Sequence, residues 1–233
     1  MRILITGGFG YLGGRMASYL INKGHEIILV SRKYRDRPKW LPKAKAVEVD
    51  FFDLNSLNSV FTGVDLIIHA AAMNSSACFK DPYLAHKMNV VATENILLAA
   101  AKSKIKKFIF LSTIHVYSDI LKGSFNEESP LLNNHPYART KRYAEELIKK
   151  ICTKNNIHFL ILRLSNIVGP PAHIEVKTWD LFANQICLKI LNKREFLINN
   201  PYDKRDFLSM ETFLIFLEKI IKEKNSFKVI NVC

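Results

Sequence analysis

The sequence predicts an α/β fold built on a doubly wound parallel sheet. Short apolar runs rich in Ile, Val and Leu alternate with helical patterns from the first residue onward, which is the order of β-α-β units. The strand-like runs are continuously apolar, as expected when helices cover both faces of a sheet. The chain has 233 residues, of which 48% are hydrophobic and 24% charged, a composition typical of one domain with a large core.

Six strands and four helices are predicted before residue 165. The strands are expected at residues 2–6, 26–31, 46–49, 66–70, 107–112 and 158–164. The helices fit between them, at residues 11–23, 54–61, 82–102 and 137–153. We therefore expect six parallel strands in a doubly wound order.

The regular alternation of strand and helix patterns ends at Gly169-Pro170-Pro171. A helix at residues 179–191, a strand at 196–199, a helix at 211–222 and a strand at 228–232 are predicted there. This tail is too short for an independent domain. We therefore expect a main domain at residues 1–168 and a small, shortened C-terminal lobe at residues 169–233, packed on the same domain.

Several kinds of protein are disfavoured. No apolar run approaches the roughly 18 residues of a membrane span, and the apolar start runs into a glycine turn, so we expect neither a membrane helix nor a signal peptide. The four cysteines are widely spaced, which predicts no metal site and a cytoplasmic location.

The charge of the chain predicts an anionic partner. Its 34 Lys and Arg residues exceed its 21 Asp and Glu residues by 34 − 21 = 13, so it should attract nucleotides, nucleotide sugars or nucleic acid. Many of the lysines flank predicted helices, and no basic, aromatic-interleaved segment or recognition helix of known type is present. We therefore expect a small anionic ligand and no nucleic acid.

A glycine-rich turn follows the first predicted strand. It reads Thr6-Gly7-Gly8-Phe9-Gly10-Tyr11-Leu12-Gly13-Gly14 and opens into an amphipathic helix. Glycines let the backbone turn tightly and approach a pyrophosphate, and the helix N-terminus offers free N–H groups. Because the turn lies between a strand and a helix, it predicts a Rossmann-type site for NAD or NADP. The alternative is a purely structural turn.

The end of the second predicted strand bears on the choice of cofactor. An acidic residue there binds the ribose hydroxyls of NAD, whereas an Arg favours the phosphate of NADP. This chain reads Ser31-Arg32-Lys33-Tyr34-Arg35, so Arg32 favours NADP. The alternative is that Arg32 extends into solvent from a basic loop.

A tyrosine and a lysine share one face of the helix predicted at residues 137–153. Tyr137 and Lys141 stand at i and i+4, one turn apart. A free tyrosine titrates near pH 10, so it acts as a base near neutrality only when its anion is stabilised, as by a neighbouring ammonium. This spacing is also common on helix surfaces, where it carries no function.

Further segments follow the predicted elements in order: Asp50-Phe51-Phe52-Asp53, His69-Ala70-Ala71-Ala72, Asn89-Val90-Val91-Ala92-Thr93-Glu94-Asn95, Ser112-Thr113-Ile114-His115-Val116-Tyr117, Arg163-Leu164-Ser165-Asn166-Ile167-Val168-Gly169-Pro170 and Arg205-Asp206-Phe207. With the glycine turn and the Tyr/Lys pair, they resemble an extended short-chain dehydrogenase/reductase of the NAD-dependent epimerase/dehydratase family. The resemblance covers nearly all of the chain. It implies these cofactor-binding residues beside Arg32: Gly7, Gly10, Tyr11, Leu12, Gly13, Asp50, Phe51, Ala70, Ala71, Ala72, Asn89, Tyr137 and Lys141.

The resemblance also implies a mechanism. Tyr137, as an anion, would take the proton of a substrate hydroxyl while hydride leaves the same carbon for the nicotinamide, or the reverse. Thr113 would hydrogen-bond the same oxygen, and Lys141 would lower the pKa of Tyr137 and bind the nicotinamide ribose. Asn166 and Arg205 would contact a nucleotide-sugar substrate.

The resemblance leaves the reaction open. The 4,6-dehydratases of the family usually carry Asp-Glu after the catalytic Thr, whereas this chain has Ile114-His115, which disfavours dehydration. Epimerisation of a nucleotide sugar and net reduction of a keto sugar both remain. We expect His115, and also His69, to pack at a strand end without a catalytic role.

The C-terminal part departs from the family pattern. Members usually run well past the last predicted strand, and Asn199-Asn200-Pro201-Tyr202 stands where a Gly-x-Gly stretch is common. A second hypothesis is therefore a non-catalytic NAD(P)-binding or sensing protein that has lost its substrate lobe. The Thr113, Tyr137 and Lys141 set argues against it, because a pure binder needs no proton relay. Since the helices at residues 82–102 and 137–153 form the dimer in relatives, the resemblance implies a homodimer.

Overall fold

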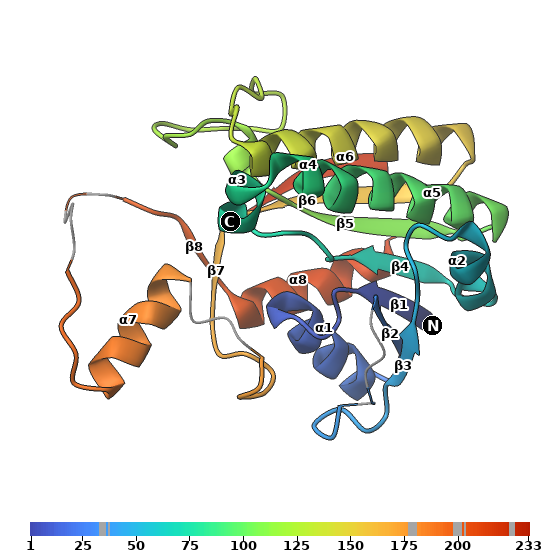
Figure 1. Ribbon diagram of the computed structural model, residues 1–233, viewed down its shortest axis with the longest axis horizontal. Coiled ribbons are helices and arrows are strands. Elements are labelled where there is room, and N and C mark those ends of the chain that lie inside the picture. The colour runs from blue at the N-terminus through green and yellow to red at the C-terminus, as the bar shows by residue number, and fades with distance from the viewer. Residues whose placement is uncertain (33–35, 37, 177–180, 198–201, 203, 224–226) are drawn as a thin grey trace.

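A parallel sheet of seven strands is the centre of the molecule (Figure 1). The computed structural model describes residues 1–32, 36, 38–176, 181–197, 202, 204–223 and 227–233. The main sheet has the order β3-β2-β1-β4-β5-β6-β9. Its first six strands in chain order are β1 (Arg2–Thr6), β2 (Glu26–Ser31), β3 (Lys45–Glu48), β4 (Leu66–His69), β5 (Lys107–Thr113) and β6 (His158–Leu164). The order reverses between β1 and β4, so the predicted doubly wound fold is confirmed.

The sheet has one strand more than the six expected. β9 (Phe227–Val232) belongs to the segment assigned to the C-terminal lobe, yet it pairs in parallel with β6, with Leu162 opposite Ile230. β6 is buried along almost its whole length, and without β9 its outer edge would leave a row of backbone groups unpaired. The last strand therefore completes the main sheet.

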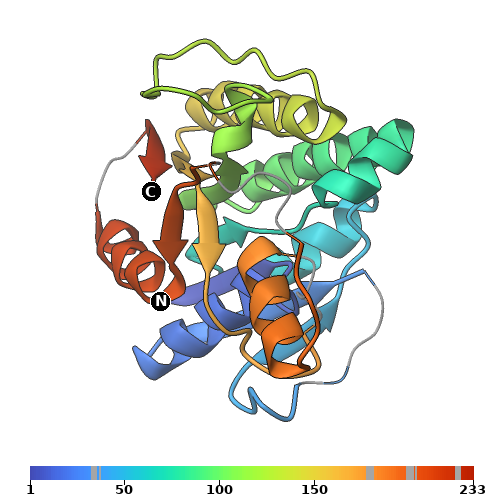
Figure 2. The same ribbon diagram turned by 90° about the vertical axis from the view of Figure 1, so that its left-hand side faces the viewer.

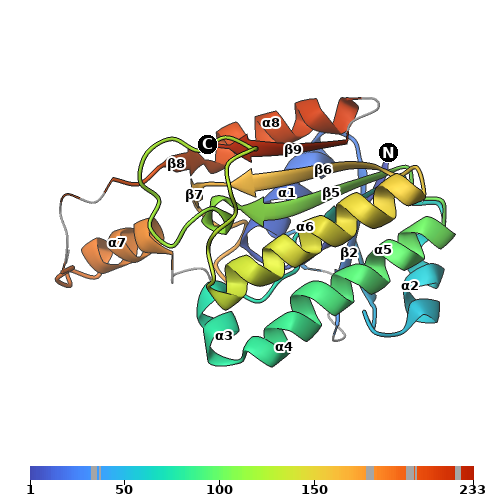
Figure 3. The same ribbon diagram turned by 90° about the horizontal axis from the view of Figure 1, so that it is seen from above.

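Helices cover both faces of the sheet. α1 (Tyr11–Asn22) and α8 (Met210–Lys222) pack on one face, where their apolar side chains join those of β1 and β6 in one core layer. α2 (Leu54–Phe61), α5 (Ala92–Lys102) and α6 (Pro136–Lys154) cover the other face and form the second layer. Figure 3 shows α4 (Pro82–His86), α5 and α6 along this second face. This explains the continuously apolar strands.

The helix expected at residues 82–102 is interrupted. α4 passes into a π-helical turn, Lys87–Val91, before α5 begins. One short helix was not predicted: α3 (Ser75–Lys80), which begins where the side chain of Asn74 accepts the N–H of Ala77. The π-turn places Asn89 at a point where an ordinary helix would rotate it away.

The C-terminal part contains a small separate ribbon. β7 (Asn166–Val168) and β8 (Phe207–Ser209) pair in parallel, and neither strand was predicted. α7 (Phe182–Leu191) lies beside them, and the first residues of its predicted range, 179–180, fall outside the described residues. The strand expected at residues 196–199 is not present in its described part, residues 196–197, and the rest falls outside.

The ribbon and α7 lie at the carboxyl ends of the main strands. The arrowheads of β5 and β6 in Figure 3 point to the side on which α7 lies, and Figure 2 looks onto that side with α7 in front. In doubly wound folds the ligand site lies outside the carboxyl ends of the strands, at the reversal of strand order. The segment from β7 to β8 therefore borders the expected site.

Candidate active site

The glycine turn between β1 and α1 is as tight as predicted. Gly10 donates its N–H to the carbonyl of Gly7 at 2.9 Å, and Gly7 has a φ of 68°. A Cβ on Gly7 would lie 2.9 Å from the backbone nitrogen of Ala71, and one on Gly13 would lie 2.1 Å from the carbonyl oxygen of Gly7. The positions thus accept glycine alone, because the turn, α1 and the end of β4 approach one another closely.

A cleft of about 610 Å³ opens above this turn. Ten of the residues predicted to bind the cofactor line it: Gly7, Gly10, Tyr11, Leu12, Gly13, Arg32, Phe51, Ala70, Ala71 and Ala72. Phe9, Val30, Ser31, His69, Met73, Asn74 and Met88 complete the lining. The structure therefore brings together residues that are up to 81 positions apart in the sequence.

Arg32 gives the cleft its charge. Among the described lining residues it has the one charged side chain, and its Nη1 lies 3.2 Å from the sulfur of Met88. Asp50, predicted beside Phe51, is not among the lining residues; its carboxylate accepts the N–H of Phe52 at 2.9 Å. The two residues at the end of the β3 segment thus differ, since Phe51 faces the cleft and Asp50 closes a turn.

The three predicted catalytic residues meet near the carboxyl end of β5. Thr113 is the last residue of β5, and its hydroxyl accepts the N–H of His115 at 3.2 Å. Tyr137 lies in the first turn of α6, which begins where His135 accepts the N–H of Tyr137. Lys141 is buried, and its ammonium lies 5.7 Å from the centre of the Tyr137 ring and donates to the carbonyl of Leu111 at 2.8 Å.

The protein alone does not make Tyr137 a base. Burial raises the pKa of Tyr137 to about 12, and burial lowers the pKa of Lys141 to about 8, against the opposing charge of Glu145. Burial of the phenol dominates the pKa of Tyr137, and the expectation that Lys141 lowers it in the working enzyme stays a prediction. Near pH 7 the pair is a neutral phenol beside a charged lysine.

None of the predicted catalytic residues is among the described lining residues of the cleft, but Lys141 lies close to His69, which is. The charge of Lys141 helps to lower the pKa of His69, which lines the cleft, and both side chains lie on the ring of Phe110. Their centres lie 4.6 Å (Lys141 Nζ) and 5.6 Å (His69 ring) from the ring centre of Phe110. The predicted contact of Tyr137 and Lys141 with a cofactor therefore stays a prediction.

Asn89 is buried and lies behind the cleft lining. Its side-chain oxygen accepts the N–H of Met73 at 2.8 Å, and its amide donates to the hydroxyl of Thr140 at 3.1 Å. Thr140 in turn donates to the carbonyl of Tyr137 at 2.8 Å. Asn89 therefore connects the rim of the cleft to the helix that carries Tyr137, and its predicted contact with a cofactor stays a prediction.

The two residues predicted to bind substrate lie in the C-terminal ribbon. Asn166 in β7 donates its amide to the carbonyl of Asp206 at 2.9 Å, which holds the start of β8. The guanidinium of Arg205 lies 5.1 Å above the centre of the Phe182 ring in α7. Burial lowers the pKa of His115 in the turn after Thr113, and the charge of Arg205 adds to this effect.

The sequence model of the NAD dependent epimerase/dehydratase family matches residues 3–233 of the chain. The chain belongs to this family. Among relatives, it is 27% identical over 172 residues to a UDP-glucose 4-epimerase of Halalkalibacterium halodurans, covering 72% of this chain and 52% of the relative. It is 28% identical over 254 residues to a dTDP-D-glucose 4,6-dehydratase of Dictyostelium discoideum, covering 99% of this chain and 58% of the relative.

The fold also matches a solved structure. A crystal structure of UDP-glucose 4-epimerase from Thermotoga maritima superposes with a TM-score of 0.88 at 22% identity and covers 100% of this chain and 76% of that one. The chain spans between half and three fifths of the length of the two curated relatives above. The predicted extended short-chain dehydrogenase/reductase assignment is confirmed.

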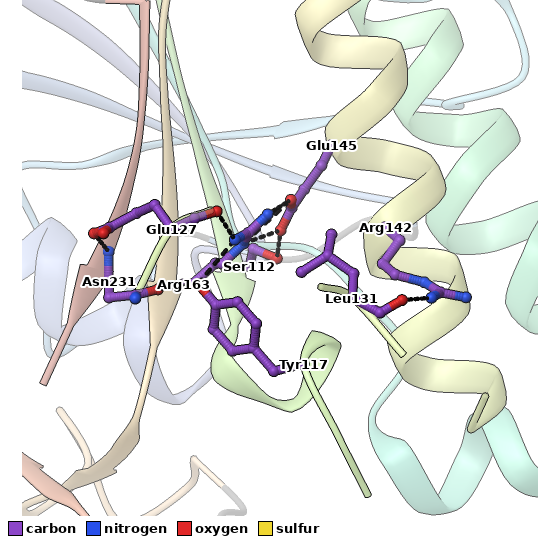
Figure 4. A network of polar contacts seen from close by, with 8 residues as sticks. All are labelled: Ser112, Tyr117, Glu127, Leu131, Arg142, Glu145, Arg163 and Asn231. Atoms are coloured by element: carbon purple, nitrogen blue, oxygen red, sulfur yellow. Dashed lines mark hydrogen bonds and ion pairs between the residues drawn. The ribbon is translucent and has the colours of Figure 1, made fainter. Parts of the chain in front are cut away.

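A buried polar network beneath the catalytic residues was not predicted (Figure 4). Arg163 of β6 and Glu145 of α6 form an ion pair with Nη2 and Oε2 2.7 Å apart, at 2% and 1% residue exposure. Ser112 donates to Glu145 at 2.5 Å. Ser112 precedes Thr113, and Glu145 follows Lys141 by one turn, so one buried pair supports the segments that carry both of these predicted catalytic residues.

The network extends to the last strand. Arg163 donates from Nη1 to the hydroxyl of Tyr117 at 2.8 Å, and Tyr117 donates to the side-chain oxygen of Asn231 in β9 at 2.6 Å. Asn231 donates its N–H to the carboxylate of Glu127 at 2.7 Å. Arg163 lies between Leu162 and Leu164, whereas Glu145 is followed by Glu146, so the sequence does not mark the two as a pair.

Within the described residues, no group of His, Cys, Asp and Glu side chains is arranged to hold a metal ion. No helix in the described part of the chain is long and apolar enough to cross a bilayer.

Proposed function

We propose that this chain transfers hydride between NAD(P) and a nucleotide sugar with the help of Tyr137 and Lys141, as an epimerase or a keto-reductase. The observation that carries the proposal is the position of Thr113, Tyr137 and Lys141. Lys141 lies 5.7 Å from the centre of the Tyr137 ring and donates to Leu111 of β5, whose last residue is Thr113. Ten predicted cofactor residues line a cleft at the ends of the neighbouring strands. A hydroxyl, a phenol and an ammonium at the edge of a dinucleotide cleft are the groups that hydride transfer at a carbinol carbon requires.

The cleft fits a dinucleotide. Gly7 and Gly13 let the turn, α1 and the end of β4 approach one another closely, and Gly10 stands at the N-cap of α1 without a side-chain cap. The first N–H groups of α1 therefore remain available to phosphate oxygens. Phe51 supplies an apolar surface for adenine at one end, and Ala70 to Ala72 border the other.

The chain's own residues would handle the proton. Thr113 and Tyr137 would hold the reacting oxygen, and Tyr137 would take its proton as the adjacent carbon gives up hydride. When bound, oxidised NAD(P) supplies the hydride acceptor and a positive charge that favours the phenolate. The ammonium of Lys141 would stabilise the phenolate together with that charge, against the desolvation that raises the pKa of Tyr137.

A nucleotide sugar is the substrate class that the relatives' names share. Arg205 lies at the ribbon that borders the site, and its guanidinium suits a diphosphate. Ile114-His115 after Thr113 favours epimerisation or reduction over dehydration. A non-catalytic sensing role is disfavoured, because Thr113, Tyr137 and Lys141 would serve no purpose in it.

The cofactor preference follows from Arg32. The family is NAD-dependent by its description. Arg32 is the one charged side chain among the described lining residues, and it favours the phosphate of NADP.

The first experiment identifies any nucleotide released on denaturing the purified protein, by mass. Tightly held NAD supports an epimerase, which keeps its cofactor between half-reactions, and contradicts the NADP preference. An empty protein that binds NADPH more tightly than NADH supports a reductase. A protein that binds none of the four dinucleotides refutes the proposal.

Two expectations from the resemblance remain proposals. A homodimer through the α4, α5 and α6 face fits the exposed side chains of Tyr83, Leu98 and Tyr143 there. A cytoplasmic location fits the four cysteines, none of which is paired. The division at residue 168 is also a proposal, in which α8 and β9 pack on the main sheet.

A further inference from the structure

A second set of buried polar groups joins the ends of β1 and β4. Thr6, His69 and Thr93 are at most 1% exposed. The hydroxyl oxygen of Thr6 lies 3.1 Å from the backbone nitrogens of both Ala70 and Ala71 and 2.6 Å from Nδ1 of His69. On the far side of the ring, Nε2 of His69 lies 2.9 Å from the hydroxyl oxygen of Thr93.

The direction of every one of these hydrogen bonds is determined. A hydroxyl has one proton and two lone pairs, and the N–H groups of Ala70 and Ala71 occupy both lone pairs of Thr6. The proton of Thr6 must therefore go to Nδ1 of His69, which has to be unprotonated. A neutral imidazole with a bare Nδ1 has its proton on Nε2, so His69 donates to Thr93.

The chain of hydrogen bonds ends at the π-helical turn. Thr93 donates its own proton to the carbonyl of Asn89 at 2.7 Å. The side chain of Asn89 holds the N–H of Met73 and, through Thr140, the carbonyl of Tyr137. This series of hydrogen bonds thus runs from the cleft residues Ala70 and Ala71 to the first turn of α6.

We infer that His69, fixed as the neutral Nε2–H tautomer, is a positioning residue that holds Ala70 and Ala71 in the cleft in register with Asn89 and Tyr137. The inference rests on the proposed function, because it assumes that the cleft binds NAD(P). The opposite tautomer would set two donors against each other at Nδ1 and Thr6, and would weaken the hold of Thr6 on the N–H of Ala71, whereas the N–H of Ala70 keeps the carbonyl of Thr6 at 3.3 Å.

The surroundings of His69 keep the ring neutral. Its side chain packs on Phe108 and Phe110, with ring centres 6.0 and 5.6 Å away, and Lys141 is the charged group that faces it. Burial, aided by that ammonium, lowers the pKa of His69 to about 3. The ring therefore does not titrate between about pH 5 and pH 9, and its tautomer is a constant feature of the folded chain.

Histidine-selective ¹⁵N NMR of the whole protein tests the tautomer without any ligand. The expected spectrum has one imidazole with a protonated Nε2 and a bare Nδ1 that is unchanged between about pH 5 and pH 9, whereas exposed histidines titrate. A spectrum in which every imidazole titrates in this range, or in which the one that does not titrate is protonated at Nδ1, overturns the inference.

A matched pair of variants tests the positioning. Thr93→Val keeps the size of the side chain but removes the acceptor of His69 and the donor to Asn89, and Thr93→Ser keeps the hydroxyl. By fluorescence titration, we expect Thr93→Val to weaken NADH binding about tenfold and Thr93→Ser to stay within about twofold of wild type. In Thr93→Val the His69 resonances should also leave the fixed Nε2–H pattern.

The outcomes separate this inference from the proposed function. Wild-type protein that binds neither NADH nor NADPH refutes the proposed function, while the NMR spectrum still decides the tautomer. Thr93→Val that binds NADH as tightly as wild type and keeps the same His69 resonances refutes the positioning role. If Thr93→Val does not fold, the comparison of Thr93→Ser with wild type and the wild-type spectrum decide.

Discussion

Arg163→Met should lower the free energy of unfolding by about 3–5 kcal/mol. The guanidinium donates to both oxygens of Glu145, at 2.7 to 3.3 Å, and to the hydroxyl of Tyr117 and the carbonyl of Glu127. Methionine fills similar space without donors, so Glu145, at 1% exposure, would keep one neutral donor, Ser112. A buried carboxylate without its partner is the costly state.

A second variant separates the unpaired charge from lost packing. Arg163→Met with Glu145→Leu removes both charges and leaves an apolar pair, which in other proteins is often neutral in stability. We expect the double variant to regain at least half of the loss, less about 1 kcal/mol for the unpaired hydroxyl of Ser112. Glu145→Gln alone should resemble Arg163→Met, because it leaves the guanidinium without a counter-charge.

Equilibrium urea unfolding, followed by circular dichroism and by tryptophan fluorescence, measures these differences. Coincident curves from the two probes justify a two-state treatment. A loss below about 1 kcal/mol in Arg163→Met, or a double variant as unstable as the single one, would refute the view that the network holds an obligatory charge pair.

The remaining predictions concern the site. Tyr137→Phe should abolish turnover and spare NADH binding, since it removes the phenol oxygen alone; retained turnover in a coupled assay contradicts the proton role. Arg32→Ala should lower the NADP-to-NAD affinity ratio about tenfold, as loss of one ion pair to a phosphate implies, and an unchanged ratio removes the argument for NADP. Gly13→Ala should prevent dinucleotide binding because its Cβ would lie 2.1 Å from the carbonyl oxygen of Gly7; a normal Kd by calorimetry would show that the turn adapts. The pKa of Lys141 is lowered to about 8 from 10.5, so between these values the unfolded protein binds more protons than the folded one. The free energy of unfolding should therefore rise with pH from about 8 to about 10. Lys141→Met should flatten that rise when it is measured by urea unfolding.

Local patterns predicted the parts of the site that lie within one turn or one helix. The glycine turn and the Tyr137/Lys141 spacing each span a few residues, and their geometry follows from a strand-to-helix turn and from the helical repeat. The strands were predictable for a similar reason, since burial on both faces leaves a continuous apolar run. β9 was assigned to the lobe because no local feature says which sheet edge a final strand will join.

The buried groups that support the site could not be predicted, because they come together from distant parts of the sequence. Arg163, Glu145, Tyr117 and Asn231 come from four separate elements, and each one alone reads as an ordinary polar residue. His69 was expected to be a packed histidine at a strand end, and it is packed. Its hydrogen-bond partners Thr6 and Thr93 stand 63 and 24 residues away, so the fixed tautomer could not be inferred from the sequence.

The two buried networks act on different sides of the same catalytic helix. The Arg163 network reaches α6 through Glu145, one turn after Lys141, whereas the His69 chain reaches it through Thr140 and the carbonyl of Tyr137. Tyr137 and Lys141 are thus held from β6 and β9 on one side and from the cofactor cleft on the other. If the two networks position Tyr137 and Lys141 independently, the changes that Thr93→Val and Arg163→Met cause in the free energy of unfolding should add. Among the described residues, the two networks share no hydrogen-bond partner. A coupling energy well above about 0.5 kcal/mol would instead show that α6 transmits strain between them.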